Sequence, residues 1–136
     1  YIDTVFEGPA LIPTAPREAA PVNRWIGTVS SSVAHMNMRR YVVEYVFHKD
    51  KDGNVVRDVI DKTVRRLPKM FAYLDAAEAP GYLGGDNFTM ADCFLTPILA
   101  SAQRFPEAQE NMANSPNLQS YFASMSERDS FKNTAS

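Results

Sequence analysis

The chain has 136 residues, enough for one domain with one hydrophobic core, and its 45% hydrophobic and 22% charged residues are typical of a folded globular protein. The formal net charge of −2 gives no overall field that would attract nucleic acid or anionic lipid, so neither is expected as a partner. No apolar run approaches the ~20 residues that cross a bilayer, which excludes a membrane-spanning helix.

The first stretch, residues 1–16, contains three prolines and a glycine, which interrupt any long helix or central strand. We therefore expect an extended segment here. Thr14 is a candidate N-cap for a helix whose first turn would tolerate Pro16. Pro21 interrupts again, so the helix either begins at Pro21 or follows a short turn there.

A first long helix is predicted over residues 22–47, which contain no proline and one glycine. Residues of this segment follow the three- and four-residue steps of one helix face. The stripe consists of Val22, Trp25, Val29, Ser32, Met36, Arg40, Val43 and Phe47. The polar residues 48–54 then form a turn.

A second long helix is predicted over residues 55–74, packed against the first as an antiparallel hairpin. Pro68 should kink or split this helix. Its apolar face has helical spacing and consists of Val55, Val56, Val59, Ile60, Val64, Leu67, Phe71 and Leu74. Glycine and proline then mark residues 79–87 as a loop.

The clearest local pattern is a threonine and an aspartate three residues apart, directly before an apolar run. Thr89 can cap a helix while the Asp92 carboxylate reaches back to the N–H of Thr89, which is a capping box. The capped helix continues to Ala102, bent at Pro97, and another proline-containing loop leads to a short helix through residues 118–125. No segment has the alternation of a strand, so we predict an all-α fold with two long antiparallel helices and a capped central helix.

Cys93 is the only cysteine, which excludes an internal disulfide and is typical of a reducing compartment; we therefore expect a cytoplasmic protein. The thiol lies in an apolar stretch, so we expect it to be buried and inert, although its closeness to the helix start at Thr89 leaves a reactive thiolate open. His35 and His48 have no cysteine neighbours at zinc-site spacing, and the acidic turn lacks a calcium ligand at its twelfth position. The sequence thus indicates no metal site and no catalytic residue of its own.

One group of side chains is a candidate for ligand binding. Ser31, His35, Met38 and Arg39 share a face of the first long helix. They are either a helix flank half-covered by neighbours or the wall of a cleft, where a mixed polar and apolar ligand would contact them.

At this point a family resemblance becomes clear. Residues 82–92, continuing to Pro97, resemble the stretch that caps the central helix in the C-terminal domain of glutathione transferases. Residues 1–3 resemble the end of that family's N-terminal domain, and residues 23–25 resemble the opening of its first long helix. Residues 125–134 resemble the family's closing segment. The similarity spans nearly the whole chain in the correct order.

The resemblance implies that residues 1–16 are the end of an N-terminal thioredoxin-like domain and a linker, and that residues 17–136 are the helical C-terminal domain. It implies a transferase used in detoxification, usually a homodimer, that conjugates its co-substrate glutathione to small hydrophobic electrophiles. The missing N-terminal domain would bind and activate glutathione. The helical domain would then supply the opposite wall of the electrophile cleft, with Ser31, His35, Met38 and Arg39 as its candidate residues.

Two alternatives remain open from the sequence. Domains similar to this one also occur in translation and scaffold proteins, so the chain could be a non-catalytic module for protein–protein assembly. It could also be an unrelated helical bundle that binds an apolar ligand. The sequence upstream would separate the first alternative from the enzyme, because only the enzyme needs the glutathione-binding residues.

Overall fold

A computed structural model of the chain describes residues 1–77 and 81–134. All regular elements in these residues are helical, which confirms the predicted all-α fold; only isolated bridges occur besides the helices. Residues 79 and 80 of the predicted loop lie outside the described part. The helices, α or π (η), are α1 (Ile2–Val5), α2 (Pro16–Thr28), η1 (Val29–Val33), η2 (His35–Val42), α3 (Val43–Phe47), α4 (Asp58–Val64), α5 (Leu67–Ala77), α6 (Met90–Ala102), α7 (Pro106–Ala113), α8 (Pro116–Ser126) and α9 (Asp129–Lys132).

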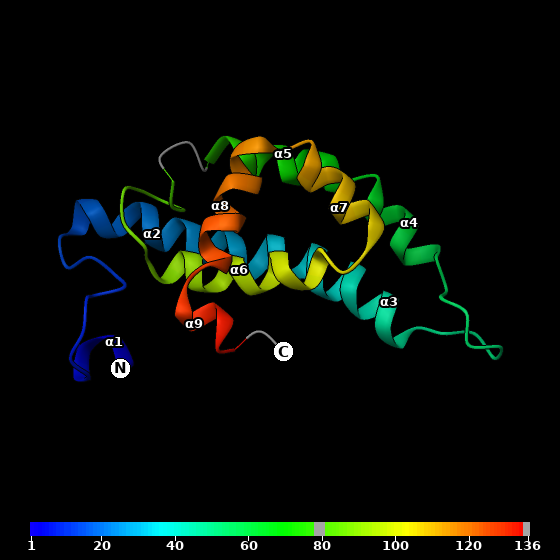
Figure 1. Cartoon of the computed structure of the whole chain (residues 1–136), viewed down its shortest axis with the longest axis horizontal. Helices are drawn as coiled ribbons and strands as arrows, with labels where there is room; N and C mark the ends of the chain where they lie inside the picture. The colour runs from blue at the N-terminus through cyan, green and yellow to red at the C-terminus, as the bar shows by residue number, and fades with distance from the viewer. Residues whose placement is uncertain (78–80, 135–136) are drawn as a thin grey trace.

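The first predicted long helix exists as one continuous rod made of α2, η1, η2 and α3 (Figure 1). It begins at Pro16 with Ala15 as N-cap, and no side chain caps it, so the prediction of Thr14 as the cap is wrong. Pro16 occupies the first turn, where its missing N–H has no partner to lose. Pro21 lies inside α2 instead of starting or interrupting it. Burial of Val22 and Trp25 directly after Pro21 holds this part of the helix against the core.

The middle of this rod is π-helical, and this changes which side chains face the core. Val29, Val33, Asn37 and Tyr41 are buried, each four positions after the last, and Val42 beside Tyr41 is buried as well. In an α-helix, four residues overshoot one turn by about 40°. A π turn contains more residues than an α turn, so each residue rotates less about the axis. Residues four positions apart therefore stay closer to one line along the rod.

The predicted stripe was therefore correct only as far as Val29. Ser32 and Arg40, which the three- and four-residue steps placed on the core face, are exposed, and Met36 is half-buried. Phe47 at the end of α3 is 77% exposed. The reason is that a sequence-based phase assumes 3.6 residues per turn, whereas the rod changes its winding at Val29.

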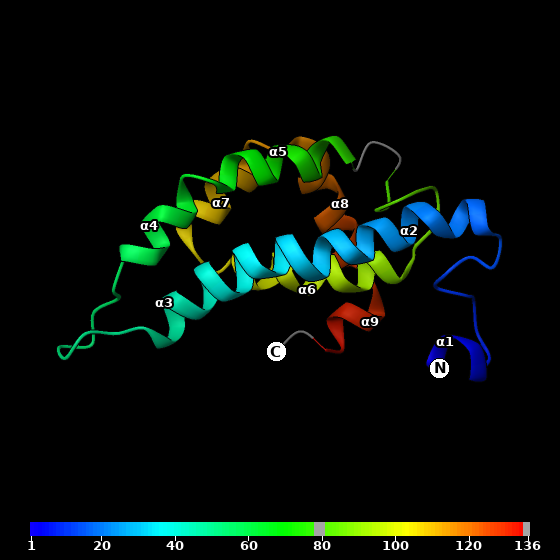
Figure 2. The same ribbon diagram turned by 180° about the vertical axis from the view of Figure 1, so that it is seen from behind.

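The second predicted helix is split into α4 and α5, as its proline indicated. Pro68 is the second residue of α5, and the break falls at residues 65–66 just before it. The two halves run back along the first rod, as Figures 1 and 2 show from opposite sides. Helix α4 packs against η2 and α3, and at the other end the Trp25 ring of α2 lies 5.3 Å from the Tyr73 ring of α5, so the antiparallel hairpin is confirmed.

The capped central helix is α6, which packs against the long rod and α8. The capping box is confirmed: the Thr89 hydroxyl accepts from the Ala91 N–H at 3.3 Å, and the Asp92 carboxylate accepts from the Thr89 N–H at 2.7 Å. Asp92 is fully buried and also accepts from the Leu83 N–H at 2.8 Å and the Tyr121 hydroxyl at 3.0 Å. One carboxylate thus joins the loop before α6, the start of α6 and α8.

Helix α7 was missed, because the proline-containing segment between α6 and α8 was expected to be a loop. Two residues gave a usable signal: Pro106 occupies the first turn and Glu107 is acidic in the same turn, both of which favour a helix start. Buried Ala108 and Met112 then hold the short helix to the core.

The two ends of the chain project from the same side of the bundle. Helices α1 and α9 both lie below α6 in Figure 1, and the reverse view in Figure 2 agrees. The carboxylate of Asp3 in α1 accepts from the N–H groups of Leu11 and Ile12 at 2.6 and 3.2 Å, which joins the first helical turn to the extended segment before α2. Among the helices described, none is long and apolar enough to cross a membrane.

Candidate functional site

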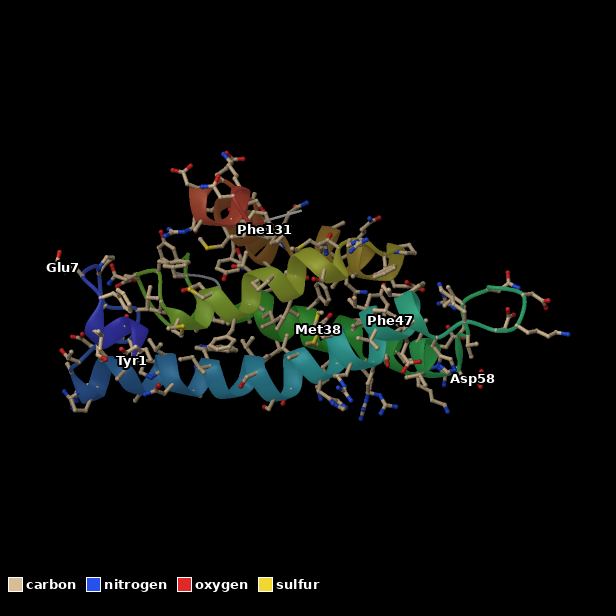
Figure 3. The ribbon with its side chains drawn as sticks, turned by 90° about the horizontal axis from the view of Figure 1, so that it is seen from below. Tyr1, Glu7, Met38, Phe47, Asp58 and Phe131 are labelled. Carbon is tan, nitrogen blue, oxygen red and sulfur yellow. The ribbon has the colours of Figure 1, made fainter. Side chains whose placement is uncertain are left out.

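The four predicted wall residues lie on the long rod but are not gathered into one cavity. Ser31, His35 and Arg39 are exposed, at four-residue steps, while Met38 is half-buried and packs against the core. The Ser31 hydroxyl donates to the Gly27 carbonyl at 2.6 Å. Met38 lies on the side of the rod next to α6, on the face that Figure 3 shows. Figure 3 thus places Met38 at the face bounded by α1 and α9.

A cavity of about 460 Å³ lies between α6 and α9. Its wall is mixed: Phe88, Pro97 and Phe131 are apolar, whereas Arg104 and Arg128 carry charge. The guanidinium of Arg128 lies over the Phe88 ring, 3.7 Å from its centroid. None of the four predicted residues lines this cavity, and the sequence pattern gave no indication of it.

Cys93 lines the α6–α9 cavity and is exposed, so the prediction of a buried thiol is wrong. An apolar run in a helix still presents some positions outward, and Cys93 and Phe94 occupy the outer side of α6. Partial burial and the neighbouring Asp92 carboxylate raise the pKa of the Cys93 thiol above its usual value. The thiol is therefore protonated at neutral pH and is a poor nucleophile.

A second, more polar groove of about 360 Å³ lies between the rod and α4. It includes His35 but not Ser31, Met38 or Arg39. Its remaining lining residues are Ser32, Met36, Arg40, Lys62, Thr63 and Arg66.

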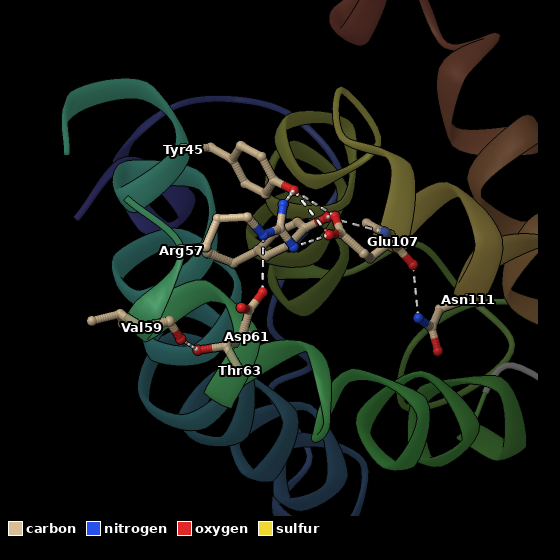
Figure 4. A network of polar contacts seen from close by, with 9 residues as sticks. Tyr45, Arg57, Val59, Asp61, Thr63, Glu107 and Asn111 are labelled. Atoms are coloured by element: carbon tan, nitrogen blue, oxygen red, sulfur yellow. Dashed lines mark hydrogen bonds and ion pairs between the residues drawn. The ribbon is translucent and has the colours of Figure 1, made fainter. Parts of the chain in front are cut away.

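A network of polar contacts closes the far end of the bundle (Figure 4). The Glu107 carboxylate at the start of α7 accepts from the hydroxyls of Tyr41 and Tyr45, both at 2.8 Å, and pairs with the Arg57 guanidinium at 2.5 Å. The Tyr45 ring stacks on Phe105 with centroids 4.3 Å apart. The network joins the rod, the segment before α4 and the start of α7.

The contacts of this network shift the pKa values of Glu107 and Tyr41 in opposite directions. Burial acts to raise the pKa of Glu107, but hydrogen bonds from Arg57, Tyr45 and Tyr41 outweigh it and lower the pKa to about 2. Burial and the hydrogen bond to Glu107 raise the pKa of Tyr41 far above its ordinary value. Each donor is satisfied by the same carboxylate, which is the pattern of a structural tie and not of a poised acid or base.

No group of three or more histidine, cysteine or acidic side chains is placed to hold a metal ion in residues 1–77 and 81–134. The capped buried helix, the antiparallel hairpin and the cavity beside α9 are thus the features to compare with other proteins.

The family model for the glutathione S-transferase C-terminal domain matches residues 35–129. A relative from Arabidopsis thaliana, glutathione S-transferase TCHQD, is 33% identical over 84 residues, which are 62% of this chain and 30% of that protein. The solved structure of glutathione transferase F7 from Populus trichocarpa superposes with a TM-score of 0.82 at 24% identity, covering 94% of this chain and 60% of that one. A structure of glutathione S-transferase III in its apo form gives 0.75 at 26% identity over 94% and 58% of the two chains. The chain thus spans less than two thirds of the length of each of these proteins.

Proposed function

Because the chain belongs to the glutathione S-transferase C-terminal domain family, we propose that it is the helical portion of a glutathione transferase and forms the electrophile-binding wall of the cleft. The observation that carries this proposal is the family match over residues 35–129 together with the face bounded by α1 and α9. Glutathione is then the co-substrate, bound mainly by an N-terminal thioredoxin-like domain outside this chain.

Exposed apolar side chains support a partner domain on this face. In the proposal, residues 1–16 are the end of the N-terminal domain and the linker. Large apolar side chains in and beside α1 are exposed to solvent: Tyr1, just before the helix, is 87% exposed, Val5 57% and Phe6, just after it, 66%. Phe94 on the outer side of α6 is 42% exposed. A domain that packed beneath α6 would bury these apolar side chains.

Met38 is the best supported of the four proposed wall residues, because it lies at this face and has a flexible, polarizable side chain suited to varied apolar ligands. Ser31, His35 and Arg39 are proposed as the polar part of the wall, since they are exposed at four-residue steps along the same rod; His35 also lines the groove between the rod and α4. Their contribution would be to orient an electrophile against the glutathione sulfur.

The proposed chemistry divides between the two domains. Conjugation needs a thiolate at neutral pH, which requires hydrogen-bond donors or positive charge at the sulfur of glutathione. The helical domain holds the electrophile in line with that sulfur, so its residues affect the binding of the second substrate and not the ionisation of the first. We also propose a homodimer, as is usual for the family, in the cytoplasm.

We predict that Met38→Ala in the full-length protein raises the KM for an apolar electrophile about fivefold, because an apolar contact of about 1 kcal/mol is lost. The KM for glutathione should not change. Steady-state conjugation kinetics with each substrate varied in turn measures both constants.

Met36→Ala is the matched control, since it removes the same half-buried side chain from the same rod, at a position that lines the other groove. It should leave both KM values within twofold of the parent. Equal effects of the two variants on the electrophile, or no effect of Met38→Ala, would exclude Met38 from the wall.

A further inference from the structure

The groove between η2 and α4 has an unusual charge. Three of its lining residues, Arg40, Lys62 and Arg66, are cationic, and no carboxylate lines it. In residues 1–77 and 81–134, the side chains of these three cations take part in no salt bridge or hydrogen bond. A chain with a formal net charge of −2 therefore concentrates unpaired positive charge at one place.

The acidic side chains near the groove are engaged elsewhere or lie outside it. Glu44, one turn after Arg40, contacts His48 at 2.7 Å. Asp61, next to Lys62, pairs with Arg57 at 2.9 Å. Asp58, one turn before Lys62, does not line the groove. The positive charge is thus not neutralised by the chain itself.

The local winding of the rod helps to build one wall of the groove. Ser32, Met36 and Arg40 follow at four-residue steps through η1 and η2, and all three line the groove. Wide π turns align these positions along the axis, as they align the buried stripe on the core side. π-Helical turns are rare and occur frequently at functional sites.

We propose that this groove binds a tetrahedral oxyanion, the phosphate or sulfate group of a small molecule. The three cations supply charge-assisted hydrogen bonds, and the Ser32 hydroxyl supplies a further donor. Met36 offers an apolar surface for the organic part of such a ligand. The groove shares no residue with the α6–α9 cavity, and of the four proposed wall residues it includes His35 alone, so the oxyanion site can be tested through Lys62 and Arg66 without changing the proposed electrophile wall.

Other occupants fit the groove less well. A second copy of the chain related by a two-fold axis through the groove would place like charges against each other. Nucleic acid would need aromatic side chains on which bases stack, and no aromatic residue lines the groove. A volume of about 360 Å³ suits one small ligand.

The test is a titration of the 136-residue chain at low ionic strength with inorganic phosphate, inorganic sulfate and phenyl phosphate, each in turn. Calorimetry measures the Kd, and backbone amide chemical shifts in NMR spectra locate the site. We expect saturable binding with a Kd near or below about 1 mM, and the largest shifts at Thr63 and Met36. Arg66→Gln should weaken binding about tenfold, because one charge-assisted hydrogen bond is lost. Lys62→Gln should act in the same direction.

Arg65→Gln is the matched control, since Arg65 is exposed beside Arg66, has the same charge and does not line the groove. It should change the Kd less than about twofold, which long-range charge alone explains. Tighter binding of phenyl phosphate than of inorganic phosphate would identify an organic ester as the ligand class, and equal binding would identify the free anion; both support the site. Equal weakening by Arg65→Gln and Arg66→Gln, shifts centred on Arg104 and Arg128, or no saturable binding below about 10 mM would overturn it.

Discussion

Asp92→Ala is expected to lower the free energy of unfolding by about 4 kcal/mol, which would remove a large part of the stability of a domain of this size. The carboxylate is fully buried and accepts from the N–H groups of Leu83 and Thr89 at 2.8 and 2.7 Å. Alanine leaves both amides buried without these acceptors, and each orphaned donor costs about 1–3 kcal/mol. Urea denaturation followed by circular dichroism measures the change.

Two further variants make this prediction specific. Thr89→Ala removes only the cap hydroxyl and should cost about 1 kcal/mol. Asp129→Ala replaces an exposed acidic residue in the first turn of α9 and should change stability by less than about 0.5 kcal/mol. If Asp92→Ala proved no worse than Asp129→Ala, the carboxylate would not be the junction that holds α6, α8 and the preceding loop together.

Glu107→Gln should produce the second largest loss, about 2 kcal/mol at pH 7. The pKa of Glu107 falls from the usual 4.5 to about 2, which corresponds to roughly 3 kcal/mol in favour of the charged form. Arg57 is 44% exposed, so screening by solvent reduces this amount. Thermal or urea unfolding of the variant against the parent protein gives the difference.

This loss must depend on pH in a definite direction. A carboxyl group with a lowered pKa in the folded state stabilises the fold above about pH 4.5, and the contribution disappears as the pH falls from about 4.5 through about 2. The gap between the parent protein and Glu107→Gln should therefore shrink between pH 6 and pH 3. Glu110→Gln, an exposed substitution on the same helix, should show no such gap at either pH. If the difference in the free energy of unfolding between the parent protein and Glu107→Gln stayed constant with pH, the ionised form of Glu107 would not be the form that stabilises the network.

The capping box illustrates what sequence can predict. Thr89 and Asp92 are close in the chain, and the preference of helix starts for such pairs is a local effect. The same holds for the break before Pro68, which follows from a missing N–H. The additional bonds of Asp92 to Leu83 and Tyr121 were not predictable, because they depend on how distant segments pack.

The winding of the long rod illustrates what sequence could not predict. The apolar stripe was extrapolated with the α-helical period, and Ser32 and Arg40 were therefore placed on the core face although they are exposed. The real stripe includes Asn37, a polar residue that is fully buried and donates to the Val33 carbonyl at 3.3 Å. Hydrophobic spacing gives no weight to such a residue, and a pattern read with the α-helical period has no means to indicate π turns.

The proposed wall residues could be predicted from the sequence only in part. Spacing placed Ser31, His35, Met38 and Arg39 on one stretch of the rod, but only the fold shows that Met38 faces the side of α1 and α9. The α6–α9 cavity was not predicted, because its walls come from segments far apart in the sequence, near Cys93 and near Phe131. Helix α7 was missed because tertiary contacts, through Ala108 and Met112, decide whether so short a helix forms.

The most direct test of the account compares thiol conjugation by the full-length gene product with conjugation by the 136-residue chain. We predict that the full-length protein is retained on immobilised glutathione and conjugates glutathione to a standard electrophile. The chain alone should give no rate above the uncatalysed background, because we propose that the groups that lower the pKa of the glutathione thiol belong to the N-terminal domain. Turnover by the isolated chain, free of contaminating transferase, would contradict the proposed division of labour. A full-length protein that neither binds nor conjugates glutathione would instead support a non-catalytic assembly module.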